Sequence, residues 1–172
     1  MTGRKPAATV LCLWLAGLAA PAGAQDLVFS MAATDSCLAA AGEAGDGRAC
    51  IGLSARRCME ANEGGETTVG MGVCLGRELE EWDRRLNAHY RALMARERRE
   101  DEEMRRIGAS APQRAAALRA MQRAWIGFRD ARCDYIAAQW GGGTGAGPAG
   151  TECRMRMTAE QALFLRRMLE EG

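Results

Sequence analysis

Residues 75–93, LGRELEEWDRRLNAHYRAL, decide the fold class of this chain. Their apolar side chains recur at spacings of three and four, which places them on one side of an α-helix. The members of this stripe are Leu75, Leu79, Trp82, Leu86, Tyr90 and Leu93. The pattern predicts one long helix that begins near a capping Thr67 or Thr68 and ends near Arg106, before Gly108. Its last part, the charged run 96–103, predicts a solvated end that projects from the core.

Two more helices are expected after this one. The first runs from Ser110 to about Gln139, and its expected core residues are Leu118, Met121, Trp125, Phe128 and Ile136. The glycine-rich stretch 141–150 predicts a loop without regular structure. A last helix is expected over 152–170, with Met157, Phe164, Leu165, Met168 and Leu169 on its apolar side. No segment alternates with period two, so we expect an all-α fold: a small antiparallel bundle built on one long helical hairpin.

The first 24 residues have the three parts of a secretory signal peptide. Arg4 and Lys5 form a basic start, an apolar run follows over 7–20, and Ala22-Gly23-Ala24 is a small-residue cleavage site. The apolar run is shorter than the roughly 20 residues that a membrane span needs. We therefore expect cleavage after Ala24, no membrane insertion of the mature chain, and a location in the periplasm or outside the cell.

The mature chain would begin at Gln25. Loss of Arg4 and Lys5 lowers the formal net charge from +1 to −1, and this near-neutral balance disfavours a nucleic-acid-binding protein. Residues 25–47 are expected to be a cysteine-containing lead that is loose at 25–35 and has a short helical piece at 36–42. Residues 48–172 are expected to form the helical domain, with a first short helix at 48–61.

Six cysteines remain after removal of the signal peptide. An even number in an exported chain indicates three disulfides. The pairs that we favour join sequence neighbours: Cys37–Cys50, Cys58–Cys74 and Cys133–Cys153. Pairing of Cys37 with Cys58 and of Cys50 with Cys74 stays open as an alternative. There is no C-x-x-C pair, which disfavours a zinc site.

The sequence contains no pattern typical of a catalytic centre. His89 is the only histidine, and the neighbouring carboxylates of pairs such as Glu80-Glu81 point in different directions on a helix. Met155 and Met157 are candidate copper(I) ligands, but methionine at helical spacing usually fills a core. We expect no catalytic residue, no cofactor and no metal, and hence a protein that is not an enzyme.

Two motifs occur together in the predicted helices. The first is Leu86-Asn87-x-x-Tyr90 in the long helix. The second spans 122–133 and includes Gln122, Trp125, Arg129 and Asp130, and Thr158 follows in the last helix. Over roughly residues 50–170 this combination resembles the lysozyme inhibitor LprI-like family of small exported bacterial proteins. The resemblance implies a helical protein that binds lysozyme and blocks its cleft.

The motif residues also have a structural interpretation. Buried amide and hydroxyl groups need hydrogen bonds, so Asn87, Tyr90 and Gln122 would satisfy one another between helices. Arg129 would pair with a carboxylate such as Asp83. We favour this structural network over a direct role in ligand or partner binding.

The partner that the resemblance implies is lysozyme, with another envelope protein as the alternative. Lysozymes are usually basic, so an inhibitor would gain association rate from an acidic face, such as Glu78-Glu80-Glu81 or the run 100–103. The loop at 141–150 is the segment expected to enter the cleft. The alternative function is a structural or stress-related envelope module that binds peptidoglycan, an envelope protein or a metal. The sequence does not indicate the oligomeric state.

Overall fold

The computed structural model describes residues 27–42, 45, 47–110 and 113–171, and every regular element in these ranges is helical. The elements are α1 (Ala32–Ala41), a 3₁₀ turn η1 (Arg48–Cys50), α2 (Leu53–Ala61), α3 (Thr68–Arg106), α4 (Arg114–Ala138) and α5 (Ala146–Glu170). The prediction of an all-α fold is confirmed. The predicted signal peptide at 1–24 lies outside the described residues.

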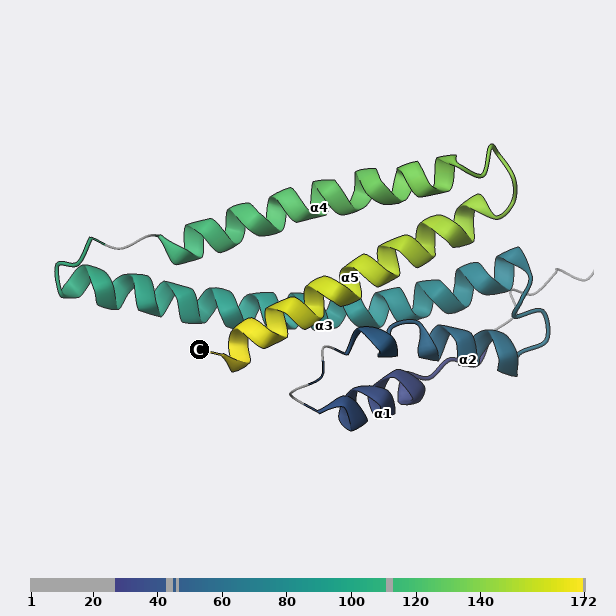
Figure 1. Ribbon diagram of the computed structural model, residues 1–172, viewed down its shortest axis with the longest axis horizontal. Coiled ribbons are helices and arrows are strands. Elements are labelled where there is room, and N and C mark those ends of the chain that lie inside the picture. The colour runs from purple at the N-terminus through teal and green to yellow at the C-terminus, as the bar shows by residue number, and fades with distance from the viewer. Residues whose placement is uncertain (1–26, 43–44, 46, 111–112, 172) are drawn as a thin grey trace, which may run out of the picture.

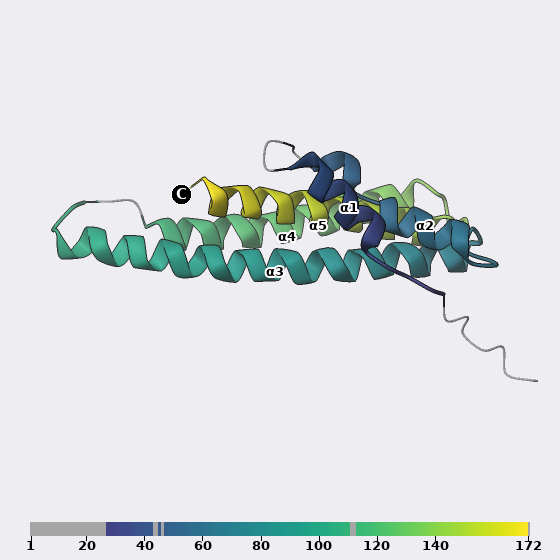
Figure 2. The same ribbon diagram turned by 90° about the horizontal axis from the view of Figure 1, so that it is seen from below.

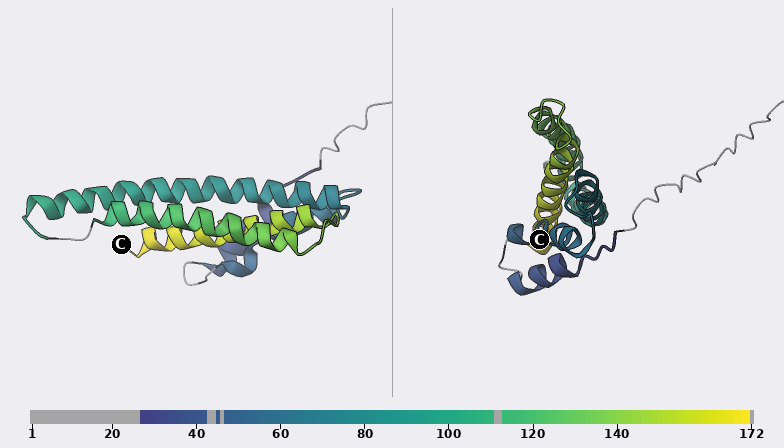
Figure 3. Two further views of the ribbon diagram at one scale, coloured as in Figure 1. Left: turned by 90° about the horizontal axis from the view of Figure 1, so that it is seen from above. Right: turned by 90° about the vertical axis from the view of Figure 1, so that its right-hand side faces the viewer.

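The 39-residue α3 is the axis of the molecule. It forms a long antiparallel hairpin with α4, and α5 crosses diagonally from the end of α4 to the middle of α3 (Figure 1). The short helices α1 and α2 cover α3 and α5 on the side away from α4 (Figures 1 and 2). Seen end-on, α5 lies between α4 and the α1–α2 pair, with α3 along its side (Figure 3).

The start of α3 follows the sequence prediction. The Thr67 hydroxyl accepts the N–H of Gly70 at 3.0 Å, which is an ordinary N-cap. The helix ends at Arg106, and Gly108 takes a positive φ of 68° just beyond it. The apolar stripe of α3 packs mainly against α5 in the core, which contains Leu75, Trp82, Leu86, Leu93, Met155, Leu163 and Leu165.

The lead was expected to be loose at 25–35, and this is wrong for residues 32–35, because α1 begins at Ala32 and is docked on the bundle. The helical piece expected at 36–42 is part of α1. Thr34 is fully buried and exchanges two 3.1 Å hydrogen bonds with Ser54 of α2. The Arg85 guanidinium of α3 donates to Asp35 at 2.6 Å. The expected single helix at 48–61 is interrupted, because Gly52 adopts a φ of 88° between η1 and α2.

Two expectations for α4 are also wrong. The helix begins at Arg114 and not at Ser110, because its first N–H groups are capped by the Asp101 carboxylate of α3. Phe128 is 60% exposed and does not belong to the core. It lies on the flank of α4, which packs only one side against the rest of the bundle. The other expected core residues of α4 are buried or half-buried.

The glycine-rich loop is shorter than predicted. Residues 146–150 form the first turns of α5, so only 139–145 connect the last two helices. Pro148 fits because the N–H groups of a helix's first turn have no intrahelical acceptor. Opposite Gly145 lies the ring of Trp140, so close that a Cβ at this glycine would be 2.3 Å from a ring carbon.

Three disulfides join Cys37 with Cys50, Cys58 with Cys74 and Cys133 with Cys153. These are the sequence-neighbour pairs. The first holds α1 to η1, the second holds α2 to α3, and the third holds the end of α4 to the start of α5. None of the helices in the described ranges combines the length and apolar character of a membrane span.

Candidate functional site

The structure gathers most of the family-motif side chains along the contact of α4 with α5. Gln122 is buried and accepts a 3.0 Å hydrogen bond from Gln161 of α5. Thr158 of α5 is fully buried beneath Arg129. On α3, Leu86 is a core residue and Tyr90 packs against the core. The contacts of Gln122 and Thr158 hold α4 to α5.

Arg129 is the centre of this network. Its Nε and Nη2 donate to the Asp130 carboxylate at 2.9 and 2.8 Å, and its Nη1 donates to the Thr158 hydroxyl at 3.4 Å. Its guanidinium carbon lies 5.0 Å from the ring centroid of Trp125, within cation–π range. The expected pairing of Arg129 with Asp83 is wrong, because the adjacent Asp130 takes that role.

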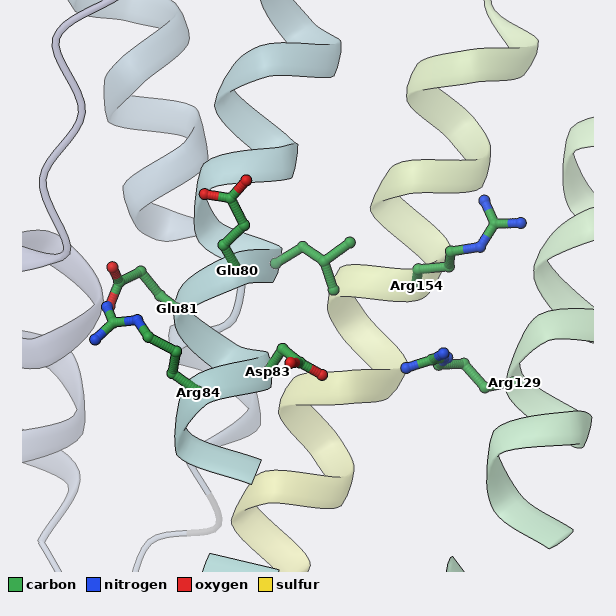
Figure 4. Close-up of a pocket in the computed structure, with 7 residues that line it drawn as sticks. Glu80, Glu81, Asp83, Arg84, Arg129 and Arg154 are labelled. Carbon is green, nitrogen blue, oxygen red and sulfur yellow. The ribbon is translucent and has the colours of Figure 1, made fainter. Parts of the chain in front are cut away.

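A groove of about 540 Å³ lies beside this network, between α3 and α4 with α5 in the middle (Figure 4). Its lining residues are Leu79, Glu80, Glu81, Asp83, Arg84, Arg129 and Arg154. The carboxylates come from α3, whereas α4 and α5 contribute arginines. Asp83 accepts a 2.8 Å hydrogen bond from the Asn87 amide, so a second motif residue besides Arg129 lies next to the groove. The expected bond between Asn87 and Gln122 is wrong, because Gln122 is bonded to Gln161.

The charges of the groove are largely balanced by neighbours. Arg84 pairs with Glu81, and Arg154 pairs with Asp134. Glu80 is 3.5 Å from Arg77 on its own helix. The single histidine is directed elsewhere, with His89 Nδ1 3.0 Å from the Ala162 carbonyl oxygen. The groove is thus lined mostly by charged residues, and most of these are paired with neighbouring side chains.

The first predicted acidic face is wrong at Glu78, which is fully buried. Its carboxylate accepts four hydrogen bonds. The donors are the Gly52 N–H (2.8 Å), the Ala55 N–H (2.6 Å), the Thr34 hydroxyl (3.2 Å) and the Trp82 indole N–H (3.0 Å). The two N–H groups belong to the N-terminus of α2, so a side chain of α3 caps this helix. The Thr34 hydroxyl belongs to α1, so the same carboxylate also joins α1 to α3.

The charged run has a second capping carboxylate. Asp101 is buried and accepts the N–H groups of Arg114 and Ala115 at 2.9 and 3.0 Å, which caps the start of α4. One turn earlier, buried Glu97 pairs with Arg96 and Arg114. The run is therefore only partly solvated, and Asp101 contributes nothing to an acidic face.

A sequence signal for these buried carboxylates existed. Glu78 lies three residues after Leu75 and four before Trp82, in phase with the apolar stripe. Glu97 and Asp101 continue the same phase after Leu93. Hydrophobic periodicity treats every carboxylate as a surface residue, so it does not identify Glu78, Glu97 and Asp101 as buried.

The connection between α4 and α5, residues 139–145, forms a compact tip at one end of the bundle (Figure 1). Its backbone is closed by hydrogen bonds from Gly143 N–H to the Trp140 carbonyl (2.9 Å) and from Ala146 N–H to the Gly143 carbonyl (3.1 Å). Trp140 is 54% exposed although it packs on Gly145. The tip is a short, hydrogen-bonded turn carrying one prominent indole.

Arg132 lies about two helical turns before the tip, and it lines a hollow of about 400 Å³ together with Trp140 and Arg156. Within the described ranges, Arg132 has no hydrogen-bond or ion-pair partner. Arg156 donates to Glu152 at 2.9 Å. The sequence prediction pointed to the tip by its glycines and missed both Trp140 and Arg132, which a search for exposed aromatic and arginine side chains next to a loop would have found.

The two candidate copper ligands do not form a pair. Met155 is fully buried in the core, whereas the Met157 sulfur lies 3.8 Å from the Cys133 sulfur. In the part of the chain that the structure describes, no three His, Cys, Asp or Glu side chains gather in a metal-binding arrangement.

Comparison with known proteins identifies the family. The model of the family described as lysozyme inhibitor LprI matches residues 58–165. An uncharacterized protein of Rhizobium meliloti (strain 1021) is 28% identical over 104 residues, which cover 60% of this chain and 75% of the relative. An uncharacterized 17.7 kDa protein in the puhA 5′ region of Rhodobacter capsulatus is 28% identical over 133 residues, 77% of this chain and 82% of the relative. No solved structure matches the chain. The matched region runs from α2 to α5 and contains both motifs, and the chain belongs to the lysozyme inhibitor LprI family.

Proposed function

We propose that the protein is exported and inhibits lysozyme by binding it and occluding its cleft, without chemistry of its own. The observation that carries this proposal is the family match over 58–165. Three disulfides in one small helical bundle support export, because such bonds persist in oxidising compartments. The chain recovered from the periplasm or medium is expected to begin at Gln25, and recovery of an intact Met1 chain from the cytoplasm alone would contradict export.

The tip is the surface that we assign to the cleft. It is the turn that joins α4 to α5, at the same end of the bundle as α2 and the start of α3 (Figure 1). A convex turn fits a concave partner better than the groove beside Arg129 does. The Cys133–Cys153 disulfide and the packing of Trp140 on Gly145 hold it in one shape. A segment ordered before binding loses less conformational entropy in the complex.

The side chains at the tip suit this role. Tryptophan and arginine are the residue types that most often dominate the energy of protein interfaces. A lysozyme cleft carries two carboxylates, so the unpartnered guanidinium of Arg132, one of the lining neighbours of Trp140, supplies opposite charge. The acidic face expected from sequence is reduced, because Glu78 and Asp101 are buried. In this proposal the charge attraction comes from Arg132 and the lysozyme carboxylates instead.

The test measures lysozyme activity on cell walls and on a soluble chitin oligosaccharide. An inhibitor slows hydrolysis of both substrates, whereas a protein that only binds peptidoglycan protects the wall alone. We expect Trp140→Ala to weaken inhibition about 30-fold and Arg132→Ala about tenfold.

Two matched variants control for position. Ile107→Ala removes an apolar side chain that is 66% exposed at the other end of the bundle. Arg123→Ala removes an exposed arginine of α4 that, like Arg132, has no partner in the described ranges. Both should inhibit like the unaltered protein. Equal losses in all four variants would exclude the tip as the contact, and absence of inhibition by the unaltered protein would exclude the function.

A further inference from the structure

We propose that the protein also binds a small single-chain amphiphile with an anionic head, in a pocket between α2, the start of α3 and the start of α5. This methionine pocket is defined by Met59, Met71, Leu75 and Met155, with Trp140 at one side and Arg56 and Arg156 at its mouth. Its volume is about 300 Å³, at the lower end of the range for small-molecule sites.

The interior of the pocket is apolar. Met155 is fully buried and Leu75 is 6% exposed, so the floor is part of the protein core. Met59 and Met71 are half-buried and form the sides. Three thioethers adapt their shape to an aliphatic chain, because methionine is unbranched and has three rotatable bonds. The interior therefore fits a hydrocarbon tail.

The mouth of the pocket carries an excess of positive charge. Arg156 is paired with Glu152 at 2.9 Å, but the Arg56 guanidinium has no hydrogen-bond or ion-pair partner within the ranges described. Gly52 lies next to both the apolar floor and the charged mouth of the pocket. A Cβ at this glycine would be 3.4 Å from the Met155 methyl carbon and 3.8 Å from an Arg156 guanidinium nitrogen. The charged mouth thus lies directly above the apolar floor.

This arrangement selects the class of ligand. A carboxylate or similar head would meet the free guanidinium of Arg56 in a charge-assisted hydrogen bond while its tail replaces water in the pocket. A cationic amphiphile would face an uncompensated arginine. The same excess charge disfavours copper(I), which three thioethers alone would accept.

The pocket shares Trp140, Ala149, Glu152 and Arg156 with the Arg132 hollow, so the two proposed sites are neighbours. Arg56 of α2 lines only the pocket, and Arg132 lines only the hollow. Arg56→Ala therefore tests amphiphile binding with the lysozyme contact unaltered, and Arg132→Ala tests the lysozyme contact with the pocket unaltered.

The experiment measures binding of decanoate to the disulfide-intact chain 25–172 by calorimetry, at concentrations below micelle formation. Decyltrimethylammonium, which has the same tail and the opposite charge, is the matched ligand. We expect saturable binding of one decanoate per chain and at least tenfold weaker binding of the cation.

Three variants locate the site. Arg56→Ala is expected to weaken decanoate binding about tenfold. Arg57→Ala should leave it unchanged, because this neighbouring arginine is exposed, pairs with Glu60 at 3.0 Å and does not line the pocket. Ala149→Leu fills the pocket from α5 and should abolish binding. Circular dichroism and the melting temperature show whether each variant is folded, and Arg56→Ala, a change at an exposed position, tests the site even if Ala149→Leu does not fold.

Three results would overturn the proposal. They are equal affinity for the two amphiphiles, equal losses in Arg56→Ala and Arg57→Ala, and absence of saturable decanoate binding to the unaltered chain.

Discussion

The two ends of the bundle use the same capping device but differ in how firmly they are held. At the tip end, Glu78 of α3 caps α2 with a fully buried carboxylate that has four donors. At the hairpin end, Asp101 of α3 caps α4 with two donors and is 9% exposed. The three disulfides join α1 to η1, α2 to the start of α3, and the end of α4 to the start of α5, and none joins the hairpin end.

This difference bears on where the proposed lysozyme contact would lie. The tip end has the Cys133–Cys153 disulfide and the four hydrogen bonds of Glu78, whereas α3 and α4 meet at the hairpin through Asp101 and the ion pair of Glu97 with Arg114. Surfaces that bind tightly gain from order present before binding. The comparison therefore supports assignment of the partner contact to the tip end.

The largest expected effect is at Glu78. Glu78→Ala leaves buried donors without an acceptor and opens a cavity, so we expect the free energy of unfolding to fall by about 3–5 kcal/mol. Glu78→Gln, which keeps the shape and one acceptor oxygen, should lose less. Urea unfolding measures both variants. A loss below about 1 kcal/mol in Glu78→Ala would contradict the role of this carboxylate.

Removal of the Cys133–Cys153 disulfide should make the tip end resemble the hairpin end. The double change Cys133→Ala and Cys153→Ala frees a loop of 20-residue separation, for which we expect a loss of about 3 kcal/mol. Lysozyme inhibition should weaken as well, because the tip is no longer fixed. Full inhibition by a folded double variant would show that the tip does not need this preorganisation.

A smaller effect is expected at Asp101. Asp101→Ala removes the cap of α4, which should cost about 1–2 kcal/mol. Hydrogen exchange should speed up around 113–118 and leave α2 unchanged. If amides of α2 exchange faster as well, the two capping sites are not the separate units described above.

The smallest effect is expected for surface ion pairs at the hairpin end. Arg105 and Glu102 are both more than half exposed, and Arg105→Ala should change stability by less than about 0.5 kcal/mol. Thermal unfolding compares it with Asp101→Ala on the same helix. A loss as large as that of Asp101→Ala would mean that general charge, and not capping, stabilises this end.

The sequence was informative where side chains follow simple periodicity. The stripe from Leu75 to Leu93 predicted α3, Thr67 and Gly108 marked its ends, and the favoured cysteine neighbours are the pairs that the structure contains. In each case the cause is local, since helix caps and short disulfide loops depend on nearby residues.

The errors arose where a residue acts on a distant element. Glu78 accepts the N–H of Gly52, 26 residues before it, and Asp101 accepts the N–H of Arg114, 13 residues after it. Neither partner is visible from local spacing. Thr34 likewise fixes α1 through Ser54 of α2. Arg129 shows the opposite error, because a pair across the bundle was expected and the adjacent Asp130 was overlooked.

The most direct test of the account is a titration of lysozyme with the oxidised chain 25–172, read as activity on a soluble oligosaccharide. We predict inhibition that saturates near one chain per lysozyme and is lost when the disulfides are reduced and alkylated. The family match and the fixed tip would then describe a working inhibitor. Unchanged lysozyme activity at micromolar excess, tested with several lysozyme types, would contradict the central claim and leave only the fold.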